Sequence, residues 1–198
     1  MKPKENFSNI FFRSTKLISE IIDKNQIEKL AQSISKIKKQ KGRIFFVGVG
    51  GSSANASHAV NDFRKLCEIE CYTPTDNVAE FSARINDDGW DSSFSNWLKI
   101  SNLNKNDAIF IFSVGGGNIK KNVSINLVKS IIYAKKVGAK IFGIVGRDGG
   151  ETKKKGDNVI LIPTIDKDLI TPQTESFQSI IWHCLVSHPL LKVKKTKW

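Results

Sequence analysis

The sequence contains little cysteine and no long apolar segment. Its three cysteines, Cys67, Cys71 and Cys184, are an odd number without zinc-site spacing, which indicates free thiols in a reducing compartment. No apolar run approaches the roughly 20 residues that a membrane helix needs, and residues 1–6 lack the apolar segment of a signal peptide. We therefore expect a cytoplasmic protein without a membrane partner.

Acidic residues are also scarce relative to basic ones. The chain has 31 Lys and Arg against 19 Asp and Glu, a formal net charge of +12. The basic residues cluster at 36–43, 153–155 and 192–197. A basic surface can attract nucleic acid or anionic metabolites, but the clusters lack interleaved aromatic residues and any nucleic-acid motif. We interpret them as solvated surface, with attraction of an anionic substrate as the alternative.

Residues 43–58 are the stretch around which the chain is organised. The apolar run 44–47 suits a strand buried on both faces, and small residues follow it at the start of a helix: Gly48, Gly50, Gly51, Ser52 and Ser53. Glycines let the backbone approach a ligand closely, and a helix N-terminus favours an anion. The stretch matches neither a Walker A loop nor the dinucleotide fingerprint, so we expect a phosphate group and no nucleotide cofactor.

Short apolar runs alternate with helical patterns, which is typical of a parallel sheet covered on both faces. Strands are expected at 44–47, 71–73, 108–112, 140–145 and 158–162. A helical pair with a break at 25–26 precedes them over 6–39, and later helices are expected at 53–67, from 77, at 90–100, at 119–137 and from 171 to about 187, with a loop at 86–89. The fold class is therefore α/β, a three-layer sandwich with a five-stranded parallel sheet plus the N-terminal helices.

At 198 residues we expect one domain over 1–198, whose helices within 1–40 pack on it or on a neighbouring subunit. A second glycine turn, residues 113–118, ends the third expected strand. Ligands bind at the carboxyl ends of parallel strands, so this turn and the first one can serve a single phosphate pocket.

With these residues in place, the chain resembles the sugar isomerase (SIS) domain, and more closely its phosphoheptose isomerase branch. The likeness covers nearly the whole chain. Its most specific parts are residues 50–58, the loop at Asn86 and Asp87, the turn at Ser113 and the last helix with His183. The resemblance implies a flavodoxin-like sheet and an isomerase that interconverts sedoheptulose 7-phosphate and a heptose 7-phosphate. It also implies a cytoplasmic homotetramer with active sites between subunits, and zinc in some members.

The same resemblance implies roles for individual residues. Asp62 and His183 would be catalytic. The residues that bind the phosphorylated sugar would be Ser52, Ser53, Asn86, Asp87, Ser113, Gly115, Gly116, Gly117, Asn118 and Glu175. A zinc or similar ion would be bound by His58, Asp62, Glu175 and His183.

Three departures from the family pattern suggest altered specificity. Asp62 stands where the family has a glutamate, and Glu175 stands where it has a glutamine. Glycines replace the hydroxyl-bearing residues that normally follow Ser113 in the second turn. These differences affect the exact substrate more than the fold.

The residues themselves allow this chemistry. An aldose–ketose isomerisation through an enediol needs a base, an acid and a group that stabilises negative charge. His58 and Asp62 are four residues apart and share one helix face. Glu175 and His183, eight apart, are separated by about 12 Å along a helix, so they can hardly meet at one ion unless two chains contribute ligands.

Each assignment has a structural alternative. His183 lies in an apolar segment and could be a core histidine, Asp62 could form a surface ion pair, and Glu175 could complement the helix dipole. Two other functions remain open: a non-catalytic sugar-phosphate-binding regulatory module, and, from charge alone, a nucleic-acid-binding protein.

Overall fold

The computed structural model describes residues 6–195, so the expectations for residues 1–5 and for the end of the basic tail, 196–198, lie outside the described residues. Five parallel strands form one sheet in the order β2-β1-β3-β4-β5. They are β1 (Ile44–Val47), β2 (Cys71–Tyr72), β3 (Ala108–Ser113), β4 (Lys140–Val145) and β5 (Asn158–Leu161). The expected α/β sandwich with a flavodoxin-like strand order is confirmed.

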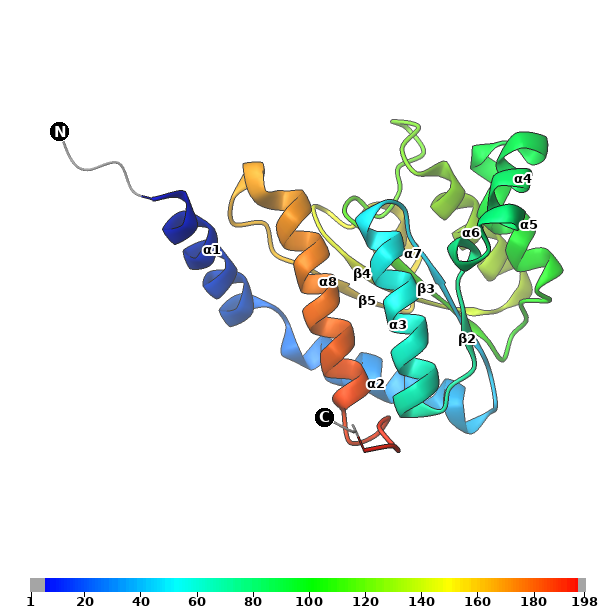
Figure 1. Ribbon diagram of the computed structural model, residues 1–198, viewed down its shortest axis with the longest axis horizontal. Helices are drawn as coiled ribbons and strands as arrows, with labels where there is room; N and C mark the ends of the chain where they lie inside the picture. Colours follow the sequence, from blue (N-terminus) through cyan, green and yellow to red (C-terminus); the bar gives the residue numbers. More distant parts are fainter. Residues whose placement is uncertain (1–5, 196–198) are drawn as a thin grey trace.

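Helices cover both faces of the sheet (Figure 1). On one face, α2 (Lys24–Lys39), α3 (Gly51–Cys67) and α8 (Ile170–Ser187) pack on Phe46, Phe110 and Phe112. On the other, α5 (Ser93–Ile100) and α6 (Ile125–Val137) pack on Phe45, Ile109 and Ile111. The strands are buried almost throughout because a parallel sheet is covered on both sides. The chain order reverses between β1 and β3, so their carboxyl ends form the switch point where ligands bind.

The N-terminal helical pair divides earlier than expected. α1 (Phe7–Ile21) ends before Asp23, and the Asp23 carboxylate caps α2 by accepting a hydrogen bond from the Gln26 backbone N–H at 3.2 Å. The expected break at 25–26 is therefore wrong by about one turn, because an aspartate at the N-cap starts the helix. Helix α2 packs on the domain beside β5 and α8, whereas α1 projects from it (Figure 1).

The region before α6 differs from the prediction. Residues 119–124, expected to be helical, form part of a small hairpin in which Asn118 and Val123 exchange backbone hydrogen bonds at 2.9 and 3.0 Å. The Asn118 side chain accepts a further hydrogen bond from the Lys121 N–H. Such side-chain bonds to nearby backbone compete with helix formation. In Figure 1 this hairpin is the yellow-green loop that projects beyond the sheet.

Three other boundaries also differ. Residues 86–88, expected in a loop, complete α4 (Val78–Asp88), which starts at Asn77 as predicted and ends at Gly89 with φ +80°. A short helix that was not predicted, α7 (Gly150–Lys155), follows β4. Helix α8 begins at Ile170 instead of Thr171, because a 3₁₀ turn over Lys167–Leu169 leads directly into it. Further 3₁₀ turns lie at Pro74–Asp76 and Trp90–Ser92.

No helix within residues 6–195 is long and apolar enough to cross a membrane. The three cysteines are free thiols, as expected; Cys67 and Cys71 are buried and Cys184 is exposed. Burial raises the pKa of the Cys67 thiol from 9.0 to about 11 and raises the pKa of Cys71 well above its ordinary value, because a thiolate is poorly solvated in an apolar environment.

The Cys67 thiol predicts a loss of stability in alkaline solution. The folded protein holds its proton more tightly than the unfolded chain, so the stabilisation is complete below pH 9 and is lost as the pH rises to about 11. This contribution is roughly 2 kcal/mol. Urea unfolding at pH 8 and pH 10.5 should show a smaller pH-dependent loss in Cys67→Ala than in wild type, and an intermediate loss in Cys184→Ala, because burial raises the pKa of the Cys184 thiol less. Equal pH dependence in all three proteins would contradict the prediction.

Candidate active site

Helices α3 and α8 lie side by side and run in the same direction, so residues along them meet in order (Figure 1). Near their start, Asn55 Nδ2 donates to the Glu175 carbonyl at 2.9 Å and to Gln178 Oε1 at 3.2 Å. Near their end, the Cys67 thiol lies 3.7 Å from the Val186 carbonyl. This parallel pairing brings two segments that are more than 100 residues apart in the sequence to one groove.

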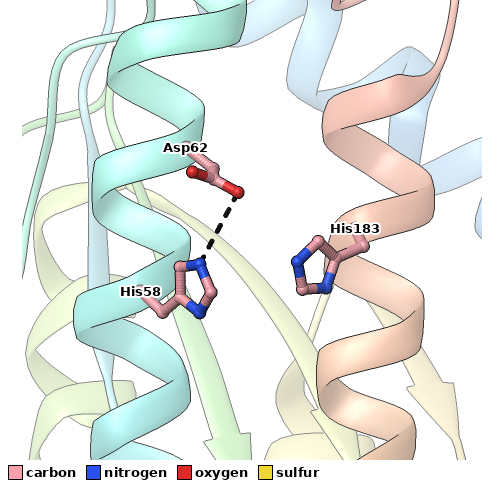
Figure 2. Close-up of side chains that lie close together, drawn as sticks. All are labelled: His58, Asp62 and His183. Atoms are coloured by element: carbon pink, nitrogen blue, oxygen red, sulfur yellow. Dashed lines mark ion pairs between the residues drawn. The ribbon is translucent and has the colours of Figure 1, made fainter. Parts of the chain in front are cut away.

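His58, Asp62 and His183 come together midway along this pair, and we refer to them as the His/Asp group (Figure 2). One ligand atom from each lies within 4.8 Å of those of the other two. His58 Nε2 is 3.8 Å from Asp62 Oδ2. His183 is exposed, so the alternative of a core histidine is wrong. The structure thus joins three of the four residues predicted to bind a metal.

Trp182 fixes the orientation of both imidazoles. Its buried ring stacks on His183 with centroids 3.5 Å apart and meets the His58 ring edge-on at 4.6 Å. His183 Nδ1 lies 2.8 Å from the Ser179 carbonyl, one turn earlier in α8. Because a carbonyl only accepts, Nδ1 carries a proton and Nε2 is left for a substrate or a metal.

The His/Asp group lines a groove of about 310 Å³ between α3 and α8. Its other lining residues are Asn61, Lys65, Leu66, Val186 and Ser187. The Asp62 carboxylate is mostly buried, with 17% of its side chain exposed, whereas the His58 side chain is 57% exposed. Asn61 Nδ2 donates to Asp62 Oδ1 at 2.8 Å, so Asp62 is oriented by a neighbour on each oxygen.

Glu175 lies apart from the His/Asp group. Its carboxylate rests against Gly51, at the first turn of α3, where a Cβ on that glycine would overlap with it. The N-terminus of a helix favours a negative charge, so Glu175 occupies the place that we expected a phosphate to take. Glu175 and His183 both lie on α8, eight residues apart, and Glu175 is not part of the His/Asp group.

The first glycine turn, residues 48–53, is tightly built. A Cβ on Gly48 would overlap with the backbone carbonyl of Ser52, and Gly50 has φ +63°. The Ser53 N–H donates to the Gly50 carbonyl at 2.9 Å. Ser52 is only 2% exposed while Ser53 is partly exposed. Of the two predicted hydroxyl donors, Ser53 is therefore the accessible one.

The second glycine turn lies beside the first, because β3 pairs with β1. The Ser113 hydroxyl accepts a hydrogen bond from the Gly116 N–H at 3.0 Å and is almost fully buried. The Gly116 carbonyl accepts from the Thr152 hydroxyl and N–H at 2.8 and 3.0 Å, and the Gly117 carbonyl accepts from the Glu151 N–H. The turn therefore holds α7 through the carbonyls of Gly116 and Gly117.

None of the predicted substrate-binding residues lines the groove itself, and three of them lie on other elements. Asn86 and Asp87 are exposed on α4, and the Asn86 side chain donates to the Asp87 carboxylate at 2.8 Å. Asn118 is part of the hairpin described above. Their roles as substrate ligands stay predictions.

Sequence reasoning missed one residue of this site. Trp182 is adjacent to His183 in the sequence, but only the packing of α3 against α8 reveals that it contacts both imidazoles. Outside the site, sequence reasoning also missed that Ser124, with φ +50°, is the N-cap of α6. The Asn-rich segment before it was a signal that the helix starts later than predicted.

Comparison with known proteins identifies the family. The family model of the SIS domain matches residues 11–146. The chain belongs to the SIS domain family. Within this SIS-domain family, the chain is 32% identical over 141 residues to the phosphoheptose isomerase of Buchnera aphidicola, covering 69% of each protein. It is also 32% identical over 158 residues to the lincomycin biosynthesis protein LmbN of Streptomyces lincolnensis, covering 74% of this chain and 56% of LmbN.

Solved structures give the same family fold. The phosphoheptose isomerase of Francisella tularensis superimposes with a TM-score of 0.78 at 18% identity, covering 90% of this SIS-domain chain and 94% of that one. That of Neisseria gonorrhoeae gives a TM-score of 0.76 at 20% identity, covering 89% and 91%. The resemblance found in the sequence motifs is thereby confirmed.

The second glycine turn predicts different costs for two glycine substitutions. Gly116 has φ +68°, and a Cβ there would overlap with the Gly149 carbonyl, so Gly116→Ala combines backbone strain with a clash and should destabilise by about 3 kcal/mol or more. Gly138, the C-cap of α6 at φ +76°, has room for a Cβ, so Gly138→Ala should cost only about 1–2 kcal/mol. Urea unfolding measures both, and equal losses would contradict the packing described here.

Proposed function

We propose that this SIS-domain protein is a phosphosugar aldose–ketose isomerase that interconverts sedoheptulose 7-phosphate and a heptose 7-phosphate. The observation that supports it most directly is the Asp62 carboxylate within 4.8 Å of the His183 imidazole in an open groove. The relatives named phosphoheptose isomerase support the substrate class.

Asp62 and His183 can divide the proton transfers between them. From the ketose, the Asp62 carboxylate removes a proton from C1, and the imidazolium form of His183 donates from Nε2 to the C2 carbonyl oxygen, which gives an enediol. Asp62 then returns its proton to C2, and His183 takes a proton from the C1 hydroxyl, which gives the aldehyde. Adjacent carbons and their oxygens lie close enough for a base and an acid separated by this distance.

The sugar chain would lie along α3. His58 is seven residues from the start of the helix at Gly51, so it lies roughly 10 Å below the glycine turns, a span that a seven-carbon chain with a terminal phosphate can cover. Glu175 lies at the glycine-turn end of this span, where its carboxylate can accept hydrogen bonds from sugar hydroxyls. Ser53 and the second turn would bind the phosphate.

The His/Asp group also fits a zinc ion. Two imidazoles and one carboxylate are a ligand set that catalytic zinc sites use, and the Ser179 carbonyl holds His183 with Nε2 free. When bound, the ion would occupy His183 Nε2, and it would supply Lewis-acid polarisation of the substrate carbonyl in place of proton donation by His183. Asp62 has two carboxylate oxygens, so one remains for proton transfer. Glu175 would not be a ligand within the same chain, because it lies beside Gly51.

We also propose a homotetramer in the cytoplasm. The groove is open on one side, since His58 and His183 are exposed, while isomerases shelter the enediol from water. Helix α1 carries exposed apolar side chains, among them Phe7, Phe12 and Ile21, which a neighbouring subunit would cover. Three free thiols suit a reducing compartment.

The catalytic assignment predicts the effect of two substitutions. Asp62→Asn and His183→Gln should each lower kcat for sedoheptulose 7-phosphate by about 10²–10⁴-fold, because each removes an acid or base. KM should change little, since neither group binds the phosphate. A coupled assay for the heptose phosphate measures this. His188→Gln is the control, because His188 pairs with Glu28 away from the groove.

Retention of activity in both variants would contradict the proposed acid and base roles of Asp62 and His183. If wild type binds the sugar phosphate but never isomerises it, the non-catalytic regulatory module becomes the better assignment.

The metal assignment predicts one Zn²⁺ per chain. Removing a direct ligand costs more than the roughly ten- to hundredfold loss expected for an outer partner, so His58→Gln should weaken Zn²⁺ binding at least ~100-fold in calorimetric titration of the purified protein. Glu175→Gln should leave the affinity within a few fold, because the carboxylate lies apart from the His/Asp group. A large loss in Glu175→Gln with none in His58→Gln would contradict the assignment.

A further inference from the structure

The second glycine turn offers an anion little to bind. Ser113 is the only residue from 113 to 118 with a hydroxyl, and that hydroxyl is nearly buried and already bonded to the Gly116 N–H. Two backbone N–H groups of the turn are also engaged, that of Gly116 with the Ser113 hydroxyl and that of Asn118 with the Val123 carbonyl. If the proposed function is right, the substrate phosphate needs a further partner at this edge of the sheet.

Arg147 lies at that edge. It comes two residues after the end of β4, whose last residue, Val145, is paired with Ser113 of β3. Its Cδ is 4.0 Å from the position that a Cβ on Gly115 would occupy, and no other atom comes as close to that position. Gly115 therefore leaves open space that the Arg147 stem borders. In an ordinary turn of this kind a side chain at position 115 would fill this space.

Arg147 has a backbone conformation that usually belongs to glycine. Its φ is +50°, and the turn around it is closed by the Gly149 N–H donating to the Gly146 carbonyl at 2.9 Å. Asp148 has a negative φ, so the φ signs match a type II′ turn, which has glycine at the first central position. Strained non-glycine residues concentrate at ligand sites, where the side chain is needed.

The Arg147 side chain is available for a ligand. It is exposed, and among residues 6–195 no carboxylate pairs with its guanidinium. Other basic residues nearby are already engaged: Lys153 donates to the Val159 carbonyl, and Lys154 and Lys155 pair with Glu151. A guanidinium presents a planar fork of donors that matches phosphate oxygens.

We propose that Arg147 binds the terminal phosphate of the substrate at the second glycine turn, in place of the hydroxyls that this turn lacks. Gly115 lets the phosphate approach the backbone closely. The Arg147 guanidinium would contact the phosphate from the turn that follows β4. The ligand class is a phosphomonoester dianion on an open-chain sugar. This inference rests on the proposed function and makes Arg147 a binding residue, distinct from the acid and base in the groove.

The test compares Arg147→Gly, Arg147→Lys and wild type. Glycine suits φ +50°, so Arg147→Gly should not lower the urea unfolding midpoint, which separates binding from folding. Its KM for sedoheptulose 7-phosphate should rise at least ~10-fold with kcat within about threefold, and inhibition by inorganic phosphate should weaken in parallel. Arg147→Lys keeps a point charge without the fork, and should fall between the two.

Lys136→Gln is the matched control. It removes one positive charge from the last turn of α6, at the opposite end of the strands, so its KM should equal that of wild type. A KM increase in Lys136→Gln as large as in Arg147→Gly would show general electrostatic attraction and overturn the proposal.

Two further outcomes separate this inference from the proposed function. If wild type isomerises the sugar and Arg147→Gly has an unchanged KM and phosphate inhibition, the inference fails while the isomerase assignment stands. If wild type does not isomerise it, calorimetric binding of sedoheptulose 7-phosphate and of inorganic phosphate still decides: loss of both in Arg147→Gly supports the inference, and unchanged binding overturns it.

Discussion

The parallel packing of α3 against α8 is the constraint on which the site depends. Both helices cover the same face of the sheet and both start at its carboxyl edge, so their residues meet in sequence order. The two helices are joined by the hydrogen bonds of Asn55 to Glu175 and Gln178. Gly51 and the Glu175 carboxylate meet at one end of the pair, and the His/Asp group forms midway along it. A shift of one helix by a turn would separate every one of these pairs.

The dipole of α3 favours the position of the Glu175 carboxylate. The Glu175 carboxylate lies at the N-terminus of α3, where backbone N–H groups favour an anion. A phosphate would compete with it there, so the second turn is the more favourable place for the phosphate. The proposed site therefore keeps three functions apart: phosphate binding at β3 and β4, sugar contacts at Glu175, and proton transfer or metal binding at the His/Asp group.

Local patterns predicted most of the fold. The five strands are short, apolar and bounded by turn residues, and each appears within one residue of its expected ends. Asn77 caps α4 as its sequence indicated. The errors occur where side chains bond to nearby backbone: the Asp23 cap moved the break between α1 and α2, and Asn118 turned the expected start of α6 into a hairpin. Such bonds depend on local geometry that hydrophobic periodicity does not report.

For the site, the sequence by itself determined the residue types and the local spacing: a glycine turn after a buried strand, and His58 one helical turn before Asp62. It could not determine that His183 is exposed and faces this pair, that Glu175 lies at the N-terminus of α3, or that Arg147 borders Gly115. These facts join residues that are 32 to more than 120 positions apart in the chain. Only the tertiary structure decided them, because they depend on which elements pack side by side, and the pattern within one helix or strand carries no information about its neighbour.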